Sequence, residues 1–330
     1  MSISIKKRKS IRNGIAVALA IACPLSFGQS GNYPNRPIKI IIPFPPGNTT
    51  DIMTRLIAPK LQERLGQPII VENKAGAAGV IGMDFVAKSK PDGYNVLMGL
   101  SSIMVSPEAE RVQGKTSLYE VDQLVPVAMI SNDPMVMLVN SSSPWKTLSD
   151  VVKAAKEKPN TINYSSSGNF GPIHLSVVMF EHAAGIKLTQ VPFGGGGPSM
   201  MALLGNQVEI TTAIPSVAIP QIQSGKVRAI AVSGPRRIKQ LPNIPTYRES
   251  GYDAEFNIWN GVFVPQGTPE PIIKTLRDAV REVANSGEME TAMQQRGMIY
   301  EYLDMADFRK FAKEDGDRMV NAVKKIGKLN

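Results

Sequence analysis

The sequence predicts an α/β fold built on two small sheets, and two observations carry this prediction. Short apolar runs of strand length alternate along the chain with segments whose apolar residues recur every three or four positions. The number of strands suits two small sheets better than one large sheet. The chain has 330 residues, and 43% of them are apolar. It is therefore long for a single hydrophobic core and long enough for two α/β domains.

The first strand and helix set the pattern. Ile38–Pro43 reads IKIIIP, an apolar run whose two faces must both be covered, as in a parallel sheet flanked by helices. A helix follows from about Thr49, with apolar residues at helical spacing at Met53, Leu56, Ile57, Leu61 and Leu65. Pro59 removes one backbone hydrogen bond, which predicts a kink, and Gly66 ends the helix.

The same alternation continues to the C-terminus. Further strands are expected at Pro68–Glu72, Tyr94–Gly99, Met135–Asn140, Thr161–Tyr164, Thr189–Pro192, Glu209–Ala213 and Val227–Val232, with a long extended segment at Phe256–Val264. Helices are expected at Ala77–Lys88, Leu148–Lys158, Pro269–Ser286 and Met305–Ile326. Because no Ser/Gly-rich linker separates the two sheets, we expect extended crossing segments to join them.

The N-terminal stretch predicts a signal peptide over residues 1–28. A basic segment comes first, formed by Lys6, Lys7, Arg8, Lys9 and Arg12. Gly14–Ala22 is an apolar run far shorter than the roughly 20 residues that a membrane-spanning helix needs. Ser26 and Gly28 suit the small-residue positions of a cleavage site, so we expect cleavage near Gly28 and a secreted protein.

Cleavage there changes both the charge and the cysteine content. It removes five basic residues and no acidic ones, which lowers the formal charge from +9 to +4. The remaining charge gives little support for nucleic-acid binding. Cys23 is the only cysteine. It could be a lipid-anchoring site, although Ala20 stands where such sites usually have leucine; otherwise the mature chain has no thiol or disulfide.

No complete catalytic set is visible in the sequence. The two histidines, His174 and His182, lie eight residues apart, which does not fit a helical zinc pair. No G-x-S-x-G motif occurs near them. Ser143–Lys146 matches S-x-x-K, but this short pattern often arises by chance and its companion motifs are missing. Gly114–Thr116 resembles the end of a phosphate-binding loop, but the rest of that loop is incomplete. We therefore expect no enzymatic activity, no catalytic residue, no cofactor and no metal.

Loops rich in Gly, Ser, Thr and Asn follow several of the expected strands. They are Pro45–Asp51, Lys74–Gly79, Leu100–Ser102, Ser165–Gly171 and Phe193–Ser199. Such loops expose backbone N–H groups at helix N-termini, which bind anions such as carboxylates without a formal positive charge. Any one of them could be an ordinary cap or turn. Five at equivalent places favour a ligand site at the carboxyl ends of the strands.

Long stretches of the chain resemble one known family. The quoted segments are YPNRPIKIIIPFPPGNTTD, INYSSSGNFGPIHLS, VPFGGGGPSMMALLGNQVEI and WNGVFVPQGTP. They resemble the Bug family, named for Bordetella uptake genes, whose members are substrate-binding proteins of tripartite tricarboxylate transporters. The resemblance covers the chain from Tyr33 to the C-terminus.

The resemblance implies a type II periplasmic-binding fold with a ligand between two lobes. Lobe one would comprise residues 29–131 and 256–330, and lobe two residues 132–255, with crossings near Ser131 and Phe256. A ligand carboxylate would be held in lobe one by Phe44, Gly47, Asn48, Thr49, Asp51, Ser101 and Ser102. Lobe two would contribute Ser166, Ser167, Asn169, Phe170, Phe193, Gly195, Ile214 and Pro215. Asp51 could instead only cap its helix. His174 would brace its loop.

Two departures from the family pattern bear on the ligand. Gly47-Asn48 stands where the family usually has Gly-Gly, and Phe170-Gly171 stands where it has Gly-Ser. The second change removes a hydroxyl donor. The ring of Phe170 could pack on a flat aromatic carboxylate, or it could pack into lobe two instead.

The resemblance also implies a mechanism and partners. An anionic ligand would dock on lobe one, and lobe two would close over it. The protein would be a periplasmic monomer that delivers a small carboxylate to the membrane subunits of the transporter. An alternative left open is a signalling role, in which the same pocket presents its ligand to a sensor.

Overall fold

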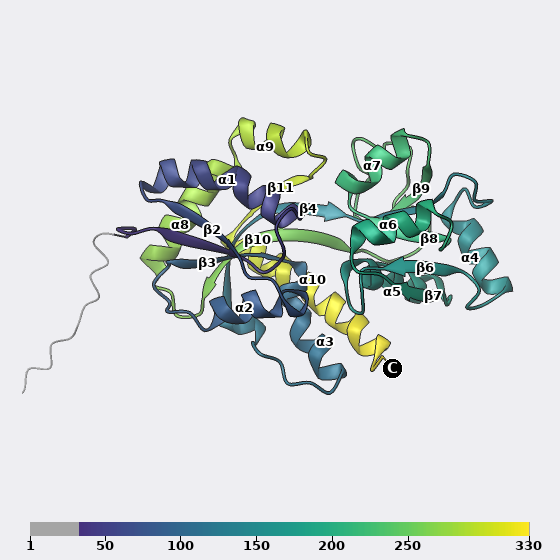
Figure 1. The fold of residues 1–330 in the computed structure, drawn as a ribbon, viewed down its shortest axis with the longest axis horizontal. Coiled ribbons are helices and arrows are strands. Elements are labelled where there is room, and N and C mark those ends of the chain that lie inside the picture. The colour runs from purple at the N-terminus through teal and green to yellow at the C-terminus, as the bar shows by residue number, and fades with distance from the viewer. Residues whose placement is uncertain (1–32, 330) are drawn as a thin grey trace, which may run out of the picture. The chain divides into compact units, whose positions relative to one another are not determined.

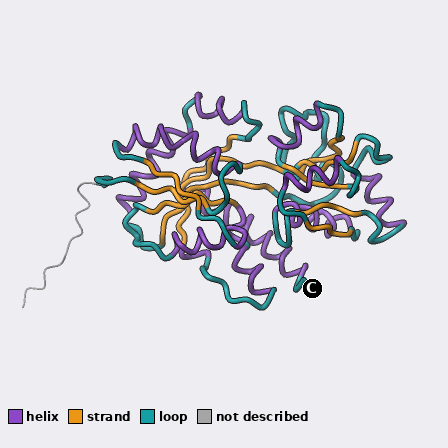
Figure 2. Tube along the Cα trace, viewed as in Figure 1, coloured by secondary structure: helices purple, strands orange, loops and turns teal. Residues whose placement is uncertain are grey.

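The computed structural model describes residues 33–329, which fold around two β-sheets (Figures 1 and 2). The expected signal peptide over residues 1–28, its cleavage near Gly28 and the alternative role of Cys23 all lie outside the described residues.

The first sheet has six strands in the order β11-β4-β10-β3-β1-β2. Their bounds are β1 Ile38–Ile42, β2 Ile69–Asn73, β3 Asn95–Leu100, β4 Leu124–Pro134, β10 Asn257–Pro265 and β11 Tyr300–Asp304. Strand β1 runs parallel to β2 and β3, whereas β10 is antiparallel to β3 and β4, and β11 is antiparallel to β4.

The second sheet has five strands in the order β7-β6-β8-β5-β9. Their bounds are β5 Val136–Asn140, β6 Asn163–Ser166, β7 Thr189–Pro192, β8 Ile210–Ala213 and β9 Val227–Val232. Strand β6 is parallel to β7 and β8, and β5 is antiparallel to β8 and β9. The strand that we expected at Thr161–Tyr164 begins and ends two residues later, so Ser165 and Ser166 belong to β6 and not to the following loop.

Helices cover the faces of both sheets (Figure 1). The α-helices are α1 Thr49–Leu65, α2 Val80–Ala87, α3 Ser106–Val112, α4 Leu148–Glu157, α5 Pro172–Ala184, α6 Gly196–Leu204, α7 Pro215–Gln223, α8 Glu270–Ala284, α9 Gly287–Gln294 and α10 Met305–Ile326. Three 3-10 helices are η1 Ala77–Gly79, η2 Ser101–Met104 and η3 Val121–Gln123.

In two of the expected helices, residues in the left-handed conformation determine where the helix ends or is interrupted. Helix α1 continues through Pro59 to Leu65 and ends at Gly66 in the left-handed conformation, as expected for a glycine cap. The single helix expected over Ala77–Lys88 is divided instead. Ala78 has φ 54° and Gly79 has φ 99°, so the helical hydrogen-bond pattern is interrupted before α2 begins.

The apolar residues of β1 show why the strand is central. Ile38, Ile40 and Ile42 belong to the cluster that α1 and α8 cover, and Ile41 belongs to the cluster on the opposite face, with α2 and α10. The strand is therefore buried on both faces, as its continuous apolar sequence predicts. The five-stranded sheet is likewise packed on both faces by two clusters.

The sequence did not reveal β4 or β11. Strand β4 reads LVPVAMISNDP, with Pro126 near its start and three polar residues near its end, so it lacks a strand-like periodicity. The chain passes from the six-stranded to the five-stranded sheet between β4 and β5, at Met135, and returns between β9 and β10. Among residues 33–329, no helix is both long enough and apolar enough to span a bilayer.

Candidate functional site

Three helix N-termini gather at one edge of the five-stranded sheet. Strands β6, β7 and β8 run parallel, and each leads directly into a helix, namely α5, α6 and α7. In the six-stranded sheet, the parallel strands β1 and β3 lead in the same way into α1 and η2. Each edge therefore presents backbone N–H groups that have no acceptor within their own helix.

The loop before α1 is held by its own side chains. Asn48 is the N-cap of α1, and its Oδ1 accepts a hydrogen bond of 3.0 Å from the Asp51 amide. The Asp51 carboxylate in turn accepts from the Gly47 amide at 3.0 Å. The Asn48 side chain therefore supplies a helix cap that a glycine at this position would lack.

Asp51 is occupied by protein groups. Its side chain is buried, and it accepts hydrogen bonds of 3.0 Å from Arg55 Nε and from Asn73 Nδ2. Burial raises the pKa of the carboxyl, but the hydrogen bonds from Arg55, Gly47 and Asn73 outweigh it and hold the pKa below its usual range. These contacts fix the loop and the first turn of α1, which is what the capping role expected of Asp51 requires.

Phe44 and Thr49 lie on either side of this loop. The Phe44 ring is half-buried against Gly79, where a Cβ would come within 2.9 Å of the ring, and its carbonyl accepts from Asn73 Nδ2 at 3.0 Å. Thr49 is half-buried at the start of α1. Asn73, at the end of β2, therefore links Phe44 to Asp51. The sequence did not single it out, since it comes directly after the expected strand Pro68–Glu72 and outside the loops considered as binding sites.

Two predicted serines carry buried hydroxyl groups without a partner. Ser102 lies in η2 and Ser167 follows β6, and within the described chain neither Oγ has a hydrogen-bond partner. Ser101 is almost fully buried beside Ser102. Buried hydroxyls are normally satisfied, so an unpaired one indicates a place for a bound water or ligand.

The loop after β6 is tied to the loop after β7. Gln190 Nε2 donates to Ser166 Oγ at 2.8 Å and to Asn169 Oδ1 at 3.2 Å. The carbonyl of Ser166 accepts from the Phe193 amide at 2.9 Å and from Ser199 Oγ at 3.1 Å. Three predicted residues are thus brought together, and Gln190 and Ser199, which we did not predict, hold them.

Both the backbone and the ring of Phe170 make contacts within the protein. Its φ is 58°, and its amide donates to His174 Nδ1 at 2.9 Å, which braces the loop. Its ring is half-buried against an apolar cluster of Val105, Met135, Ile173, Leu175, Phe256, Met319 and Val323. His174 itself is buried, and this burial lowers its pKa to about 4, so the ring is neutral and Nδ1 is free to accept.

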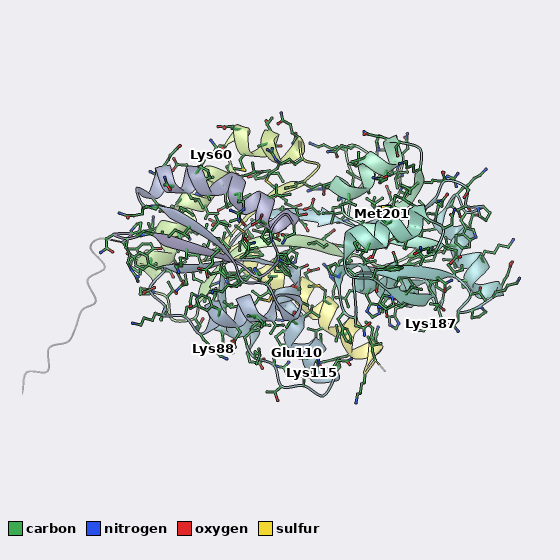
Figure 3. All side chains as sticks on the ribbon, in the orientation of Figure 1. Lys60, Lys88, Glu110, Lys115, Lys187 and Met201 are labelled. Atoms are coloured by element: carbon green, nitrogen blue, oxygen red, sulfur yellow. The ribbon has the colours of Figure 1, made fainter. Side chains whose placement is uncertain are left out.

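The remaining predicted residues lie at the starts of α6 and α7. Gly195 is the N-cap of α6 with φ 141°, and a Cβ there would meet open space. Ile214 is the N-cap of α7, Pro215 is its first residue, and Ile214 packs against the same cluster as Phe170. Phe193 packs against a different cluster, on the five-stranded sheet. Helix α6 also exposes Met201 (Figure 3).

The predicted residues form two groups, one at each sheet. Within residues 33–329, no hydrogen bond joins the group around α1 and η2 to the group around α5, α6 and α7. The same part of the chain holds no cluster of His, Cys, Asp or Glu side chains that could bind a metal ion.

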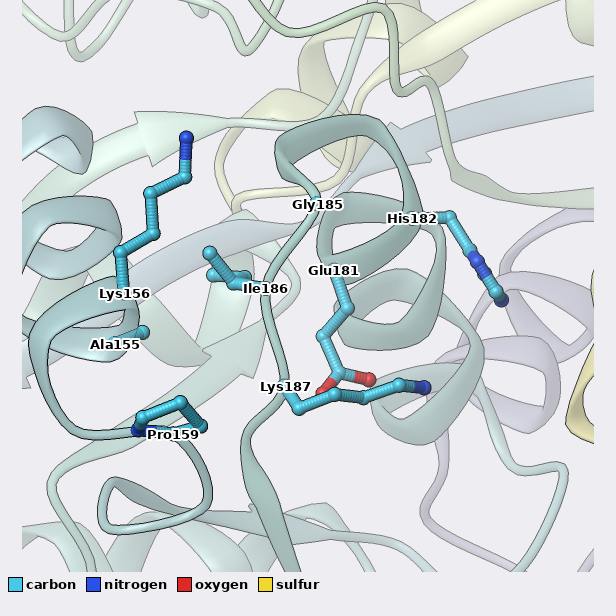
Figure 4. A pocket seen from close by; sticks show the side chains of 8 residues that line it. All are labelled: Ala155, Lys156, Pro159, Glu181, His182, Gly185, Ile186 and Lys187. Carbon is cyan, nitrogen blue, oxygen red and sulfur yellow. The ribbon is translucent and has the colours of Figure 1, made fainter.

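A separate pocket of about 420 Å³ opens between α4 and α5 (Figure 4). It is lined by Ala155, Lys156, Pro159, Glu181, His182, Gly185, Ile186 and Lys187, none of which is a predicted site residue. Its two lysines point in different directions (Figure 4), so they do not converge on one anion.

Comparison with known proteins gives a consistent result. Residues 53–328 match the model of the tripartite tricarboxylate transporter family receptor, TctC. The chain is 34% identical over 319 residues to protein BugT of Bordetella pertussis. The matched stretch covers 95% of this chain and 96% of BugT. A solved R. palustris structure with adipate is 27% identical with a TM-score of 0.78, covering 90% of this chain and all of that one. MatC from Rhodopseudomonas palustris with bound malate is 28% identical with a TM-score of 0.74, covering 88% of this chain and all of MatC.

Proposed function

Because this chain belongs to the tripartite tricarboxylate transporter receptor family, we propose that it is a periplasmic solute-binding receptor for a small aliphatic dicarboxylate. Residues 29–131 with 256–330 form lobe one, and residues 132–255 form lobe two. The receptor is a monomer that is exported by its signal peptide and delivers its ligand to the membrane subunits of such a transporter.

One observation carries the proposal. Two sets of helix N-termini stand at the carboxyl edges of the two sheets, each beside a buried serine hydroxyl that has no hydrogen-bond partner among residues 33–329. Ser102 belongs to one set and Ser167 to the other. This arrangement offers hydrogen-bond donors for a carboxylate at each end of a ligand. Relatives with adipate and with malate support a ligand of that class.

The position of Phe170 favours an aliphatic over an aromatic acid. Its ring packs on the apolar cluster around Val105 and Ile173, and its amide is held by His174. To stack on a flat ligand, the ring would have to leave these contacts. Of the two packing roles considered for Phe170, packing within the protein is therefore the one that we propose.

Capture needs no charged clamp in this arrangement. A ligand carboxylate docks at the amides of the first turn of α1, where the helix dipole favours negative charge. The Asp51 carboxylate lies in the same turn, but its ion pair with Arg55, at 3.0 Å, offsets its repulsion of the ligand. Lobe two then closes, and the amides and hydroxyls of its loops bind the second carboxylate.

Calorimetric titration of the purified secreted protein tests the proposal. Malate, adipate, citrate, benzoate and terephthalate are titrated in turn, and we expect binding of at least one aliphatic dicarboxylate and none of benzoate. Ser167→Ala is expected to weaken that binding about tenfold, the usual order for one lost hydrogen bond to a charged group. The control is Ser224→Ala at the exposed end of α7. Binding of the aromatic acids alone would contradict the proposal.

A further inference from the structure

Gly171 is the N-cap of α5, and its backbone conformation does not require a glycine. Its φ of −69° and ψ of 166° lie in the extended region, which every residue type adopts. Gly168 in the same loop differs, because its φ of 98° favours glycine. A serine or an asparagine would serve better than glycine as a helix cap. Backbone conformation and helix capping therefore give no reason for a glycine at position 171.

The space beside the Gly171 Cα atom is taken by Ser167. A Cβ on residue 171 would lie 2.7 Å from Ser167 Oγ, closer than such atoms come in folded proteins. It would also lie 3.1 Å from the Ser167 carbonyl oxygen and 3.2 Å from the Gly168 carbonyl oxygen, which are tight contacts. The missing side chain of Gly171 thus leaves free the volume in which the Ser167 hydroxyl lies.

The backbone on both sides of Ser167 is held by hydrogen bonds. Before it, the Ser166 carbonyl accepts from the Phe193 amide at 2.9 Å. After it, the Gly168 carbonyl accepts from the Gly171 amide at 3.2 Å. Rotation of the Ser167 side chain to another staggered rotamer is therefore its least costly escape from a methyl group at position 171. Such a rotation carries the hydroxyl away from its present place.

The Ser167 hydroxyl is available to a ligand where it now lies. Its Oγ is buried and has no hydrogen-bond partner among residues 33–329. The N-cap Gly171 makes no side-chain hydrogen bond, so no capping group occupies the first amides of α5. The chain has no acidic residue from Ser165 to Phe180. The hydroxyl and these amides can therefore donate together to a carboxylate from outside the protein.

We propose that Gly171 is a positioning residue of the ligand site, because its missing side chain fixes the rotamer in which the Ser167 hydroxyl meets the ligand. The inference rests on the proposed function, in which Ser167 binds the second carboxylate of the ligand. Gly171 acts through Ser167 and needs no contact with the ligand itself. Any residue with a Cβ at position 171 turns the hydroxyl away, so the position requires glycine as long as residue 167 is serine.

Calorimetric titration with malate and with adipate tests the pairing of Gly171 with Ser167 in four proteins. They are the unaltered protein, Gly171→Ala, Ser167→Ala and the variant with both changes. Each single change should raise the Kd about tenfold, because both remove the same hydrogen bond to the carboxylate. The double variant should also bind about tenfold more weakly, and not about a hundredfold, because the added methyl group then has no hydroxyl to displace.

A second measurement needs no ligand. Crystal structures of the ligand-free unaltered protein and of ligand-free Gly171→Ala are compared at Ser167, and we expect a different Ser167 rotamer in the variant. The matched control is Gly287→Ala, at the first residue of α9, where a Cβ meets open space and the backbone conformation also suits any residue. This control should change neither the rotamer nor the Kd.

The outcomes separate this inference from the proposed function. If the unaltered protein binds none of the acids, the proposed function fails, and the Ser167 rotamer still tests the role of Gly171. If it binds, an unchanged rotamer or an unchanged Kd in Gly171→Ala overturns that role, as does a loss of about a hundredfold in the double variant. If Gly171→Ala does not fold, the double variant decides. Its folding shows that Ser167 Oγ was the obstacle, and its failure to fold overturns the assignment.

Discussion

Gly297 and Ser216 make a backbone contact between two distant parts of the chain. A Cβ on Gly297 would lie 2.8 Å from the Ser216 Cα, closer than folded proteins allow. Gly297 lies between α9 and β11, and Ser216 lies in the first turn of α7. Nearby, Ile299 packs against the apolar cluster of the five-stranded sheet, and Arg236 pairs with Glu301 at 3.1 Å. The segment before β11 thus contacts the start of a helix at the candidate site.

The first prediction is that Gly297→Ala separates these two segments. Gly297 has φ 69°, so alanine adds about 1 kcal/mol of backbone strain, and its methyl group must also displace Ser216. The matched control is Gly225→Ala, which has φ 71° and open space around the position, so it reports backbone strain alone. We expect Gly297→Ala to lower the unfolding temperature further than the control and to weaken ligand binding. Equal effects of the two variants would show that the contact has no role.

The second prediction concerns the loop before α1. Asp51→Ala removes the acceptor that holds the Gly47 amide, Arg55 and Asn73, so the loop should lose its fixed shape. We expect a loss of about 2 kcal/mol in unfolding free energy, the order for hydrogen bonds to a buried charged group. The measurement is chemical denaturation. The control is Asp317→Ala, which removes an exposed ion pair with Lys313 and should change stability by less than about 1 kcal/mol.

The periodic parts of the fold could be predicted from sequence. Strand β9 and helix α10 have the predicted bounds, because their apolar spacing agrees with their burial. Strands β4 and β11 could not be found, since pairing with distant strands, and not local periodicity, makes them extended. Asn132 and Asp133 are polar in sequence yet buried near the end of β4. From sequence alone such residues suggest a loop, because the strands with which they pair are not known.

The candidate site shows the same division. Glycine- and hydroxyl-rich loops after parallel strands could be located from composition, and the structure places them at the strand ends. The residues that hold those loops could not. Asn73 and Gln190 sit in or at the end of strands, and only the paired register of β2 with β1 and of β7 with β6 brings them to the loops they support.

The third prediction is a loss of stability in acid that depends on His174. Burial lowers its pKa to about 4, below the ordinary value of 6.5, so the folded state binds fewer protons than the unfolded state between these two pH values. Stability contributed by the neutral ring is therefore complete above pH 6.5 and is lost as the pH falls toward 4, by about 3 kcal/mol at most. Protonation also removes the acceptor for the Phe170 amide.

Denaturation at a series of pH values tests this. His174→Asn keeps an acceptor but cannot be protonated, so its stability should fall less than that of the unaltered protein between pH 6.5 and 4. His182→Asn, an exposed position near the end of the same helix, is the control. Partial burial and the nearby Lys187 and Lys325 also lower the pKa of His182, but the group is exposed, so His182→Asn should follow the unaltered protein more closely than His174→Asn does. Parallel curves for His174→Asn and the unaltered protein would refute the assignment.

The fourth prediction has the opposite sign and concerns Asp133, near the end of β4. Burial raises the pKa of Asp133 to about 7, and the hydrogen bond from the Ile299 amide offsets only part of that rise. The folded state therefore binds more protons than the unfolded state between about pH 4 and pH 7, and stability falls as the pH rises through this range. Asp133→Asn keeps an acceptor for Ile299 and carries no charge. It should match the unaltered protein near pH 4 and exceed it above pH 7, by about 4 kcal/mol at most. His174 acts in the opposite direction over nearly the same range, so the two contributions partly cancel in the unaltered protein. Relative to the unaltered protein, Asp133→Asn should steepen the loss of stability in acid and His174→Asn should lessen it, and a common slope in all three proteins would contradict both assignments.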